Sequence, residues 1–336
     1  MSRPDEPKRR IPARPPATPG QRLMRWEVML LVVAGAIFLF NANASPYFLD
    51  PWNLSDATFN FTEKAIIALA MALLIIAAEI DLSVAATLAL ASTAMGAAAE
   101  AGAPTPLLIA IGLGTGLLCG AFNGALVTRL GLPSIVITIG TLSLYRGIAQ
   151  VVLGDGVYKA YPKDFAFFGQ GYVWWVFSFE FVLFLALALV FAIVLHFTVF
   201  GRWVFAIGNN PVAARFSGVR VERVKFILFL LTGLMSGLAA ILLTSRVGAT
   251  RPNIAFGWEL EVVTLVVLGG VSILGGSGTI PGVVIAAFVM GLLTFGLGLL
   301  NVPGIVILIF IGALLIGVIT LPVAVRWIGS LGRGRA

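Results

Sequence analysis

Residues 208–218 read GNNPVAARFSG and form a short polar insertion between two long apolar stretches of the chain. Within it, Asn210 is suited to cap a helix and Pro211 to take the first helical position, while Gly218 is suited to the left-handed turn that ends a helix. The sequence therefore predicts about two turns of surface helix here. Such a helix is either an ordinary amphipathic connector or a surface that a partner protein grips.

Apolar stretches recur along the whole chain. Of its 336 residues, 59% are hydrophobic and only 11% are charged, and the mean hydropathy is +1.03. A helix that crosses about 30 Å of hydrocarbon needs about 20 apolar residues. The composition thus predicts an all-α protein, a polytopic transmembrane helical bundle with about ten spans. The expected spans are 26–44, 62–79, 83–99, 105–129, 134–153, 174–198, 226–246, 259–274, 279–299 and 303–322.

Two of these expected spans are short. They cover 83–99 and 259–274, so either can be a broken or re-entrant helix, and nine spans is the alternative to ten. We expect the transmembrane domain at 26–322, preceded by a disordered, basic cytosolic tail at 1–25 and followed by a short cytosolic tail at 323–336.

The basic residues are distributed asymmetrically along this pattern. With both chain ends inside, 16 of the 22 Lys and Arg residues fall in cytosolic segments, and the other six lie on or near the outer side. The positive-inside rule then predicts the orientation of the bundle. The same distribution explains the sequence pI of about 10.0 without nucleic acid, because the chain has no soluble domain with the stacking surfaces that nucleic-acid binding needs.

A pair of acids separates the second and third expected spans. The segment Glu79–Ser83 reads EIDLS, and charge between two apolar runs is expensive in a membrane. In one interpretation, Asp81 or Ser83 caps the following helix while Glu79 lies at the interface. In the other, the helix is broken there and exposes polar groups to a water-filled substrate path. A second polar cluster, at 251–261, opens the eighth span. In both places acids precede an apolar run, and this similar layout suggests an internal repeat.

Neutral polar residues also lie within the expected spans. Asn123, Thr138 and Thr141 could hydrogen-bond an uncharged hydroxylated solute, although each alone more often bonds within its own helix. Together with the acid segment they give the candidate substrate-path residues Glu79, Asp81, Ser83, Asn123, Thr138 and Thr141.

The chain offers little for catalysis or cofactors. The segment 269–282, GGVSILGGSGTIPG, lacks the Gly-Lys-Ser/Thr ending of a phosphate-binding loop and joins two apolar runs, which favours a tight turn with close helix packing. Any ATP is therefore hydrolysed on another polypeptide, and we do not expect the chain to be an enzyme. One cysteine, Cys119, and one histidine, His196, leave no disulfide and no cluster for zinc or haem, so no metal or cofactor is expected.

Four segments carry a resemblance to a known family. They read EIDLSVAATLALAS (79–92), GAFNGALVTRLGLPSIVITIGTLSLYRGIAQVV (120–152), GRWVFAIGNNPVAARFSGVRVERVK (201–225) and ELEVVTLVVLGGVSILGGSGTIPG (259–282). In this order and spacing the chain, from about residue 50 to 320, resembles the permease subunits of bacterial ABC importers for ribose-type sugars. The resemblance implies a type II importer fold in the bacterial inner membrane. It also implies a cytosolic ATP-binding subunit, a periplasmic sugar-binding protein, and a second permease copy or paralogue.

The resemblance also assigns a role to the polar insertion. Val212-Ala213-Ala214 followed by Gly218 resembles the Glu-Ala-Ala-x-x-x-Gly coupling signature of importer permeases, with Val212 where the signature has Glu. The implied ATPase-coupling residues, within a coupling loop at 199–225, are Asn210, Pro211, Val212, Ala213, Ala214, Arg215 and Gly218.

A second departure from the family pattern occurs at the acid segment. The family usually has Gly-Gly-Ile-Asp-Leu-Ser there, and Ala78-Glu79 replace the two glycines in this chain. Together with the segment SPYFLDPWNLSDATFNFTEKA at 45–65, this difference points to the branch that resembles rhamnose and autoinducer-2 importers.

Two other classes of protein are weighed against this one. An ion-coupled secondary transporter of a small neutral solute needs ionisable groups deep in the membrane, and the pair Glu79 and Asp81 offers few of them. A membrane-embedded enzyme is disfavoured because the sequence has no Ser-His pair, HExxH motif or clustered Asp motif. The sequence therefore favours an importer permease subunit.

Overall fold

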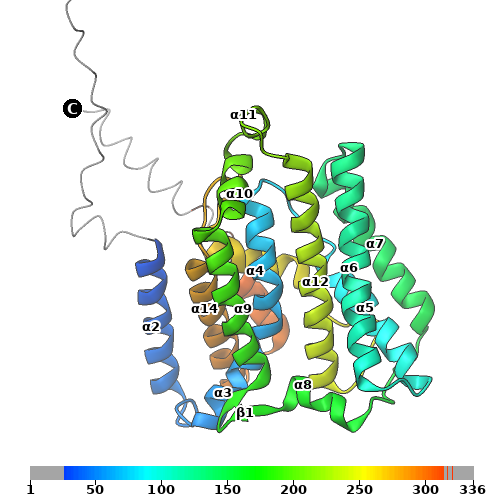
Figure 1. Ribbon diagram of the computed structural model, residues 1–336. Coiled ribbons are helices and arrows are strands. Elements are labelled where there is room, and N and C mark those ends of the chain that lie inside the picture. The colour runs from blue at the N-terminus through cyan, green and yellow to red at the C-terminus, as the bar shows by residue number, and fades with distance from the viewer. Residues whose placement is uncertain (1–25, 314–315, 317–319, 321–336) are drawn as a thin grey trace, which may run out of the picture.

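The computed structural model describes residues 26–313 together with 316 and 320, so the tails expected at 1–25 and 323–336 lie outside the described residues. The described chain is a bundle of helices with one two-stranded hairpin, which confirms the all-α prediction (Figure 1). The elements are α2 (Trp26–Ala44), α3 (Pro51–Phe59), α4 (Thr62–Ile76), α5 (Val84–Glu100), α6 (Thr105–Leu130), α7 (Ser134–Leu153), η1 (Lys163–Ala166), α8 (Phe167–Gln170), β1 (Tyr172–Trp174), β2 (Phe177–Ser178), α9 (Phe179–Phe197), α10 (Val199–Asn209), α11 (Pro211–Phe216), α12 (Val221–Val247), α13 (Trp258–Leu268) and α14 (Ile280–Leu299).

Six helices of the described chain are long and apolar enough to cross a membrane: α2, α6, α7, α9, α12 and α14. The pair α3 and α4, bent by 48° at a short break, adds a seventh when it is counted as one span. The segments Val84–Glu100 and Gly304–Ala313 are shorter apolar helices. The polytopic bundle is thus confirmed, while the number of ten spans stays a prediction that depends on these shorter helices and α13.

The two ends of the bundle carry different structures (Figure 1). α10 and α11 lie together at one end, which we call the α11 face, and α3, α8 and the β1–β2 hairpin lie at the opposite end, which we call the hairpin face. The sequence analysis anticipated α11, but it did not anticipate α3, α10 or the hairpin.

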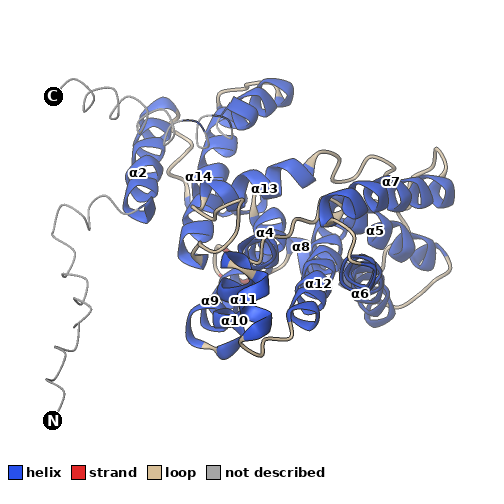
Figure 2. Ribbon diagram, turned by 90° about the horizontal axis from the view of Figure 1, so that it is seen from above, coloured by secondary structure: helices blue, strands red, loops and turns tan. Residues whose placement is uncertain are grey.

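α4 forms the centre of the bundle, between α9, α12, α13 and α14 (Figure 2). Of its 15 residues, all except Lys64 are buried. From residue 65 to its end α4 is apolar all round, and such a helix has no face suited to water and is stable only when other elements surround it. The position of α4 therefore follows from its composition.

α13 is too short to cross a membrane alone. Its 11 residues rise about 16 Å, roughly half of the hydrocarbon thickness. The glycine-rich loop after it, residues 269–279, continues towards the α11 face, where the N–H of Gly276 donates to the carbonyl of Ile76 at 2.9 Å. A Cβ atom at Gly282 would lie 2.1 Å from the carbonyl oxygen of Gly269, so the predicted close helix packing is confirmed. The predicted tight turn is wrong, because α13 and α14 are joined by a loop that spans residues 269–279.

Glycines let α6 and α12 cross with their backbones in contact. A Cβ atom at Gly116 would lie 2.3 Å from the carbonyl oxygen of Gly233, and one at Gly120 would lie 2.4 Å from that of Phe229. Small residues spaced four apart are typical of membrane helices that pack this closely. The glycines of α6 therefore have a packing role at its crossing with α12.

We predict that Gly116→Ala destabilises the protein and that Gly114→Ala, in the same helix, does not. The added methyl group at 116 forces the α6 and α12 backbones apart, and such overpacking costs about 1–3 kcal/mol. No atom lies within 4 Å of a Cβ placed at Gly114, where alanine improves helix propensity by up to about 1 kcal/mol. Thermal unfolding of the purified variants in detergent measures both effects. Equal midpoints for the two variants would contradict the close crossing.

Candidate functional site

α11 (Pro211–Phe216) is the short helix predicted from the polar insertion. The Asn210 side chain caps it, because its Oδ1 atom accepts hydrogen bonds from the backbone N–H groups of Val212 and Ala213, both at 3.0 Å. Gly218 follows the helix with a φ of 86°, the left-handed conformation predicted for it. The predicted start and stop of this helix are therefore confirmed.

Most of α11 faces away from the protein. The Ala214 side chain is only 4% exposed and seats the helix on the bundle, whereas Val212 and Phe216 are 56% and 90% exposed. Arg215, between these two apolar residues, forms an exposed ion pair with Glu222 in the first turn of α12. α11 thus presents an apolar surface, and the charge of its own Arg215 is matched by Glu222.

α10 (Val199–Asn209) carries α11 and packs against the end of α4. A Cβ atom at Gly208 would lie 1.8 Å from the carbonyl oxygen of Ile76, so only glycine permits this approach. The glycine-rich loop closes the same corner, because the Asn209 side chain donates to the carbonyl of Gly276 at 3.2 Å. Three segments that lie far apart in the sequence therefore meet next to α11.

The chain is interrupted between α4 and α5 over residues 77–83, which we call the break. Within it, Ala78 has a φ of 61°, a left-handed conformation that costs a residue other than glycine about 1–2 kcal/mol. The importer family that the sequence resembles usually has glycine at this position. The structure gives the physical reason for that preference and shows that alanine tolerates the same backbone here.

Asp81 is the centre of a buried hydrogen-bond network in the break. Its Oδ1 atom accepts from the N–H and the hydroxyl of Ser83, at 2.9 and 2.6 Å. Its Oδ2 atom accepts from the Thr232 hydroxyl at 3.3 Å and from the Asn123 amide at 3.5 Å. Asn123 also donates to the Ser83 hydroxyl at 2.8 Å and accepts from the Tyr145 hydroxyl at 3.1 Å. The network joins the break to α6, α7 and α12.

The network agrees with each of the two interpretations of the acid segment only in part. The helix is broken and polar groups gather at the break, but these groups are buried. Ser83 stands at the cap position of α5, but its side chain donates to Asp81 instead of capping the helix. Thr138 reaches the break by donating to the Ile80 carbonyl at 3.4 Å, and Thr141 bonds within its own helix. In this conformation the residues satisfy one another inside the protein and do not line an open path. The members of the candidate path that are at most 4% exposed are Asp81, Ser83, Asn123, Thr138 and Thr141.

Glu79, the remaining candidate path residue, forms an ion pair with Lys225 of α12. Both side chains are mostly buried, with exposed fractions of 11% for Glu79 and 21% for Lys225. The pair lies beside a cavity of about 360 Å³ that α11, the loop after α6 and the start of α12 also line. Lys225 lies one helical turn after Glu222, the partner of Arg215. The start of α12 is therefore linked by ion pairs to both α11 and the break.

Three residues of this site were not predicted from the sequence: Tyr145, Thr232 and Lys225. The available signal was Glu79, since an acid inside a membrane needs a basic partner. That signal does not name the partner, however, because Lys225 lies 146 positions away in the sequence.

Comparisons with known proteins agree on the family. The family model described as "Branched-chain amino acid transport system / permease component" matches residues 53–319. The autoinducer 2 import system permease protein LsrC of Yersinia pseudotuberculosis is 35% identical over 213 residues, which are 63% of this chain and 60% of that protein. The L-arabinose transport system permease protein AraH of Escherichia coli K12 is 36% identical over 200 residues, 59% of this chain and 60% of that protein.

A third relative is the autoinducer 2 import system permease protein LsrD of Enterobacter sp., which is 35% identical over 211 residues, 61% of this chain and 64% of that protein. The chain thus aligns with less than two thirds of the length of these relatives. No solved structure matches the chain. The family model nevertheless spans the bundle from α3 to the helix that begins at Gly304, and it includes α11, the break and the glycine-rich loop. This chain therefore belongs to the family of branched-chain amino acid transport system permease components.

Proposed function

We propose that this chain is the membrane-spanning permease subunit of an ATP-driven importer. In this role it moves a sugar or sugar-like solute, delivered by a periplasmic binding protein, into the cytoplasm. The observation that carries the proposal is α11, a capped helix with an exposed apolar surface that stands on the corner where the break and the glycine-rich loop meet. The names of the relatives, which refer to L-arabinose transport and autoinducer 2 import, support it. ATP hydrolysis then belongs to a partner subunit, and the chain itself is no enzyme.

The proposed orientation places the α11 face in the cytosol of a bacterium, with the protein in the inner membrane. The five Lys and Arg residues between 202 and 225 support this orientation under the positive-inside rule. An ATP-binding subunit would cover α11, and a second permease copy or paralogue would complete the transporter. The binding protein would dock on the hairpin face, which exposes Trp52, Trp174 and Trp175 by 51%, 72% and 62%.

Two ion pairs give a physical route from the partner subunit to the membrane interior. A push on α11 acts on the start of α12 through the Arg215–Glu222 pair, and α12 acts on the break through the Lys225–Glu79 pair. Because α12 is a continuous helix of 27 residues, it moves as a lever rather than bending locally. The substrate-path role of Glu79, Asp81, Ser83, Asn123, Thr138 and Thr141 then belongs to a conformation in which this lever has opened the break.

The chemistry of the break favours an uncharged hydroxylated solute. When the break opens, the hydroxyl and amide groups of the Asp81 network lose their present partners, and a solute that does not replace them leaves polar groups unpaired at about 1–3 kcal/mol each. A sugar offers hydroxyl groups that both donate and accept. Among sugar-like solutes, the names of the relatives favour autoinducer 2 or L-arabinose as the substrate. The resemblance of the segment at 45–65 to rhamnose importers makes rhamnose a third candidate.

Reconstitution in liposomes tests the function as a whole. We expect the chain to accumulate solute only when its ATP-binding subunit, the solute-binding protein and ATP are all present. An uncoupler should not reduce this uptake as long as ATP is supplied. Uphill transport by the chain alone, driven by a proton or sodium gradient, would instead establish an ion-coupled secondary transporter.

The seating of α11 provides a sharper test. We predict that Ala214→Trp abolishes ATP-driven uptake, because an indole ring cannot fit at a position that is 4% exposed and the helix must lift from the bundle. Gly218→Pro should do the same by changing the left-handed turn after the helix. Leu118→Trp, at a position of α6 that is 72% exposed, is the matched control and should transport normally. Normal uptake by both α11 variants, with membrane insertion equal to the wild type, would rule out the coupling role.

The Glu79–Lys225 pair can be tested by exchanging its charges. Glu79→Lys and Lys225→Glu should each lower uptake at least tenfold, because breaking a mostly buried ion pair costs about 3–5 kcal/mol. The double variant restores opposite charges and should recover much of the activity, as a double-mutant cycle requires of coupled residues. Arg215→Ala breaks an exposed pair and should change the stability by less than about 1 kcal/mol. Additive losses in the double variant would show that the two side chains act independently.

A further inference from the structure

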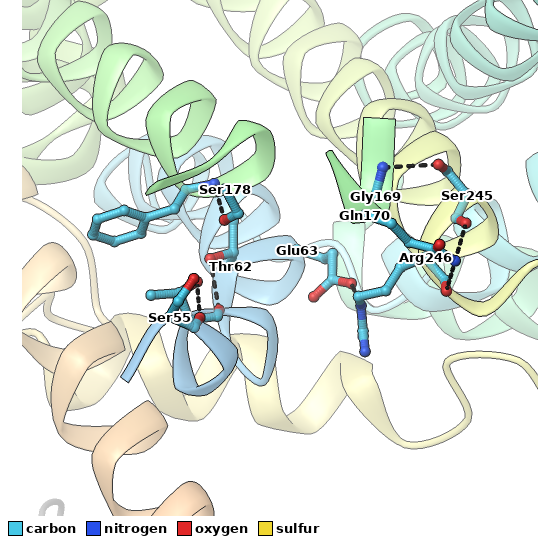
Figure 3. Close-up of polar contacts among 10 residues, drawn as sticks. Ser55, Thr62, Glu63, Gly169, Gln170, Ser178, Ser245 and Arg246 are labelled. Carbon is cyan, nitrogen blue, oxygen red and sulfur yellow. Dashed lines mark hydrogen bonds and ion pairs between the residues drawn. The ribbon is translucent and has the colours of Figure 1, made fainter. Parts of the chain in front are cut away.

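Apart from the Asp81 network, a group of polar side chains lies at the hairpin face, where α4, α8, α9 and α12 meet (Figure 3). The end of α12 is held there by α8, since the Gly169 N–H donates to the Ser245 hydroxyl at 2.8 Å and the Gln170 amide donates to the Arg246 carbonyl at 2.9 Å. We call this region the outer junction. The proposed coupling mechanism does not use it.

The outer junction buries two acids and one base. Arg246 donates from Nε to Glu63 of α4 at 2.7 Å, and Glu63 is only 1% exposed. Glu180, the second residue of α9, is also 1% exposed, and neither of its carboxylate oxygens has a hydrogen-bond partner among the described residues. α9, which carries Glu180, packs against α4, which carries Glu63.

The number of charges does not balance if both acids are ionised. Arg246 matches one carboxylate, Glu63, and leaves Glu180 as a buried negative charge without a hydrogen bond. An uncompensated buried charge is strongly destabilising. The other elements packed on α9 do not leave a free base at this site. Lys64 of α4 is paired with Glu261, Arg202 of α10 lies at the α11 face (Figure 1), and α8 and α14 carry no charged residue. The titratable groups that α3 and β1 contribute are Asp56, which is exposed, and Tyr172, which is 38% exposed.

The missing positive charge is best supplied by the smallest cation. A metal ion such as Ca²⁺ needs about six to eight oxygen ligands, and Mg²⁺ keeps an octahedral shell. Among the described residues no group of three or more His, Cys, Asp and Glu side chains lies close enough together to hold a metal ion. A proton requires a single carboxylate oxygen and no further space.

We propose that Glu180 is a proton-binding site of the outer junction and is occupied at neutral pH. The two acids then carry one negative charge between them, which Arg246 matches, and α9 docks on α4 and α12 without an unpaired charge. Loss of the proton introduces that charge and loosens the contact between α9 and its neighbours. The junction is therefore sensitive to pH at the end of the bundle opposite to α11, and this inference does not depend on the transport function.

Infrared spectroscopy of the full-length protein in detergent tests the proposal directly. We expect a carbonyl stretch from a protonated carboxyl group in the wild type at neutral pH. Glu180→Gln should remove the part of this band that Glu180 contributes, and Asp56→Asn, at an exposed acid of the neighbouring helix α3, is the control and should leave the band unchanged. A wild-type spectrum without the band, or a band with the same intensity in Glu180→Gln as in the wild type, would overturn the proposal.

Thermal unfolding between about pH 5 and pH 9 provides the second measurement. A native chain that keeps a proton which the unfolded chain releases loses stability as the pH rises, by up to tenfold in the unfolding equilibrium constant per pH unit. Glutamine imitates the neutral acid, so Glu180→Gln should match the wild type near pH 5 and exceed its stability near pH 9. A variant that is less stable than the wild type by the same amount at every pH would show that Glu180 acts as an ion.

Discussion

The break between α4 and α5 has to satisfy its polar groups in a place without water. In lipid each unpaired backbone group costs several kcal/mol, so an interrupted membrane helix persists only where the protein supplies partners. Here the Ser134 hydroxyl accepts the N–H of Ile80, the N–H of Gly276 donates to the Ile76 carbonyl, and side chains from two helices, α6 and α12, donate to Asp81. The close approach of α7, α10 and the glycine-rich loop follows from this requirement.

The same requirement explains why α12 occupies its place. It reaches the break through Lys225 and Thr232 near one end and the outer junction through Arg246 at the other. Both ends are thereby tied to α4 or to the residues that directly follow it, through Glu63 and Glu79. A helix of 27 residues fastened at both ends, and crossing α6 through glycines between them, leaves few ways to move except as one body with α4.

The parts of this structure that the sequence could predict are those set by local chemistry. Asn210 and Gly218 define α11 because capping and left-handed turns depend on a few neighbouring residues. The break was visible because Glu79 and Asp81 are conspicuous between apolar runs. The partners of these acids were not visible, since polarity shows that a buried group needs a partner but does not say which one.

The short elements α3, α10 and the β1–β2 hairpin were hidden for a related reason. α3 and the hairpin strands occupy only 2 to 9 residues, too few for a hydrophobic period to stand out from the apolar runs beside them. α10 is amphipathic, but it is short and directly follows the apolar helix α9. α10 has only 11 residues, yet its Gly208 packs against the end of α4. This contact determines the position of α11, which follows α10 directly. The sequence therefore identified the residues of the α11 face more completely than the contacts that connect them to the membrane interior.

Position 212 of α11 carries valine and not an acid, and the charges around α11 show how this helix can contact a partner without one. In the importer signature that the chain resembles, a glutamate stands there, and it could pair with a base of the ATP-binding subunit. Here Arg215 is already matched by Glu222, and the outward surface consists mainly of Val212 and Phe216. In the proposed complex, the contact would then gain its free energy from apolar area removed from water, at about 25 cal/mol per Å². Such a contact is screened little by salt, so coupling through α11 would be less sensitive to ionic strength than coupling through an exposed ion pair.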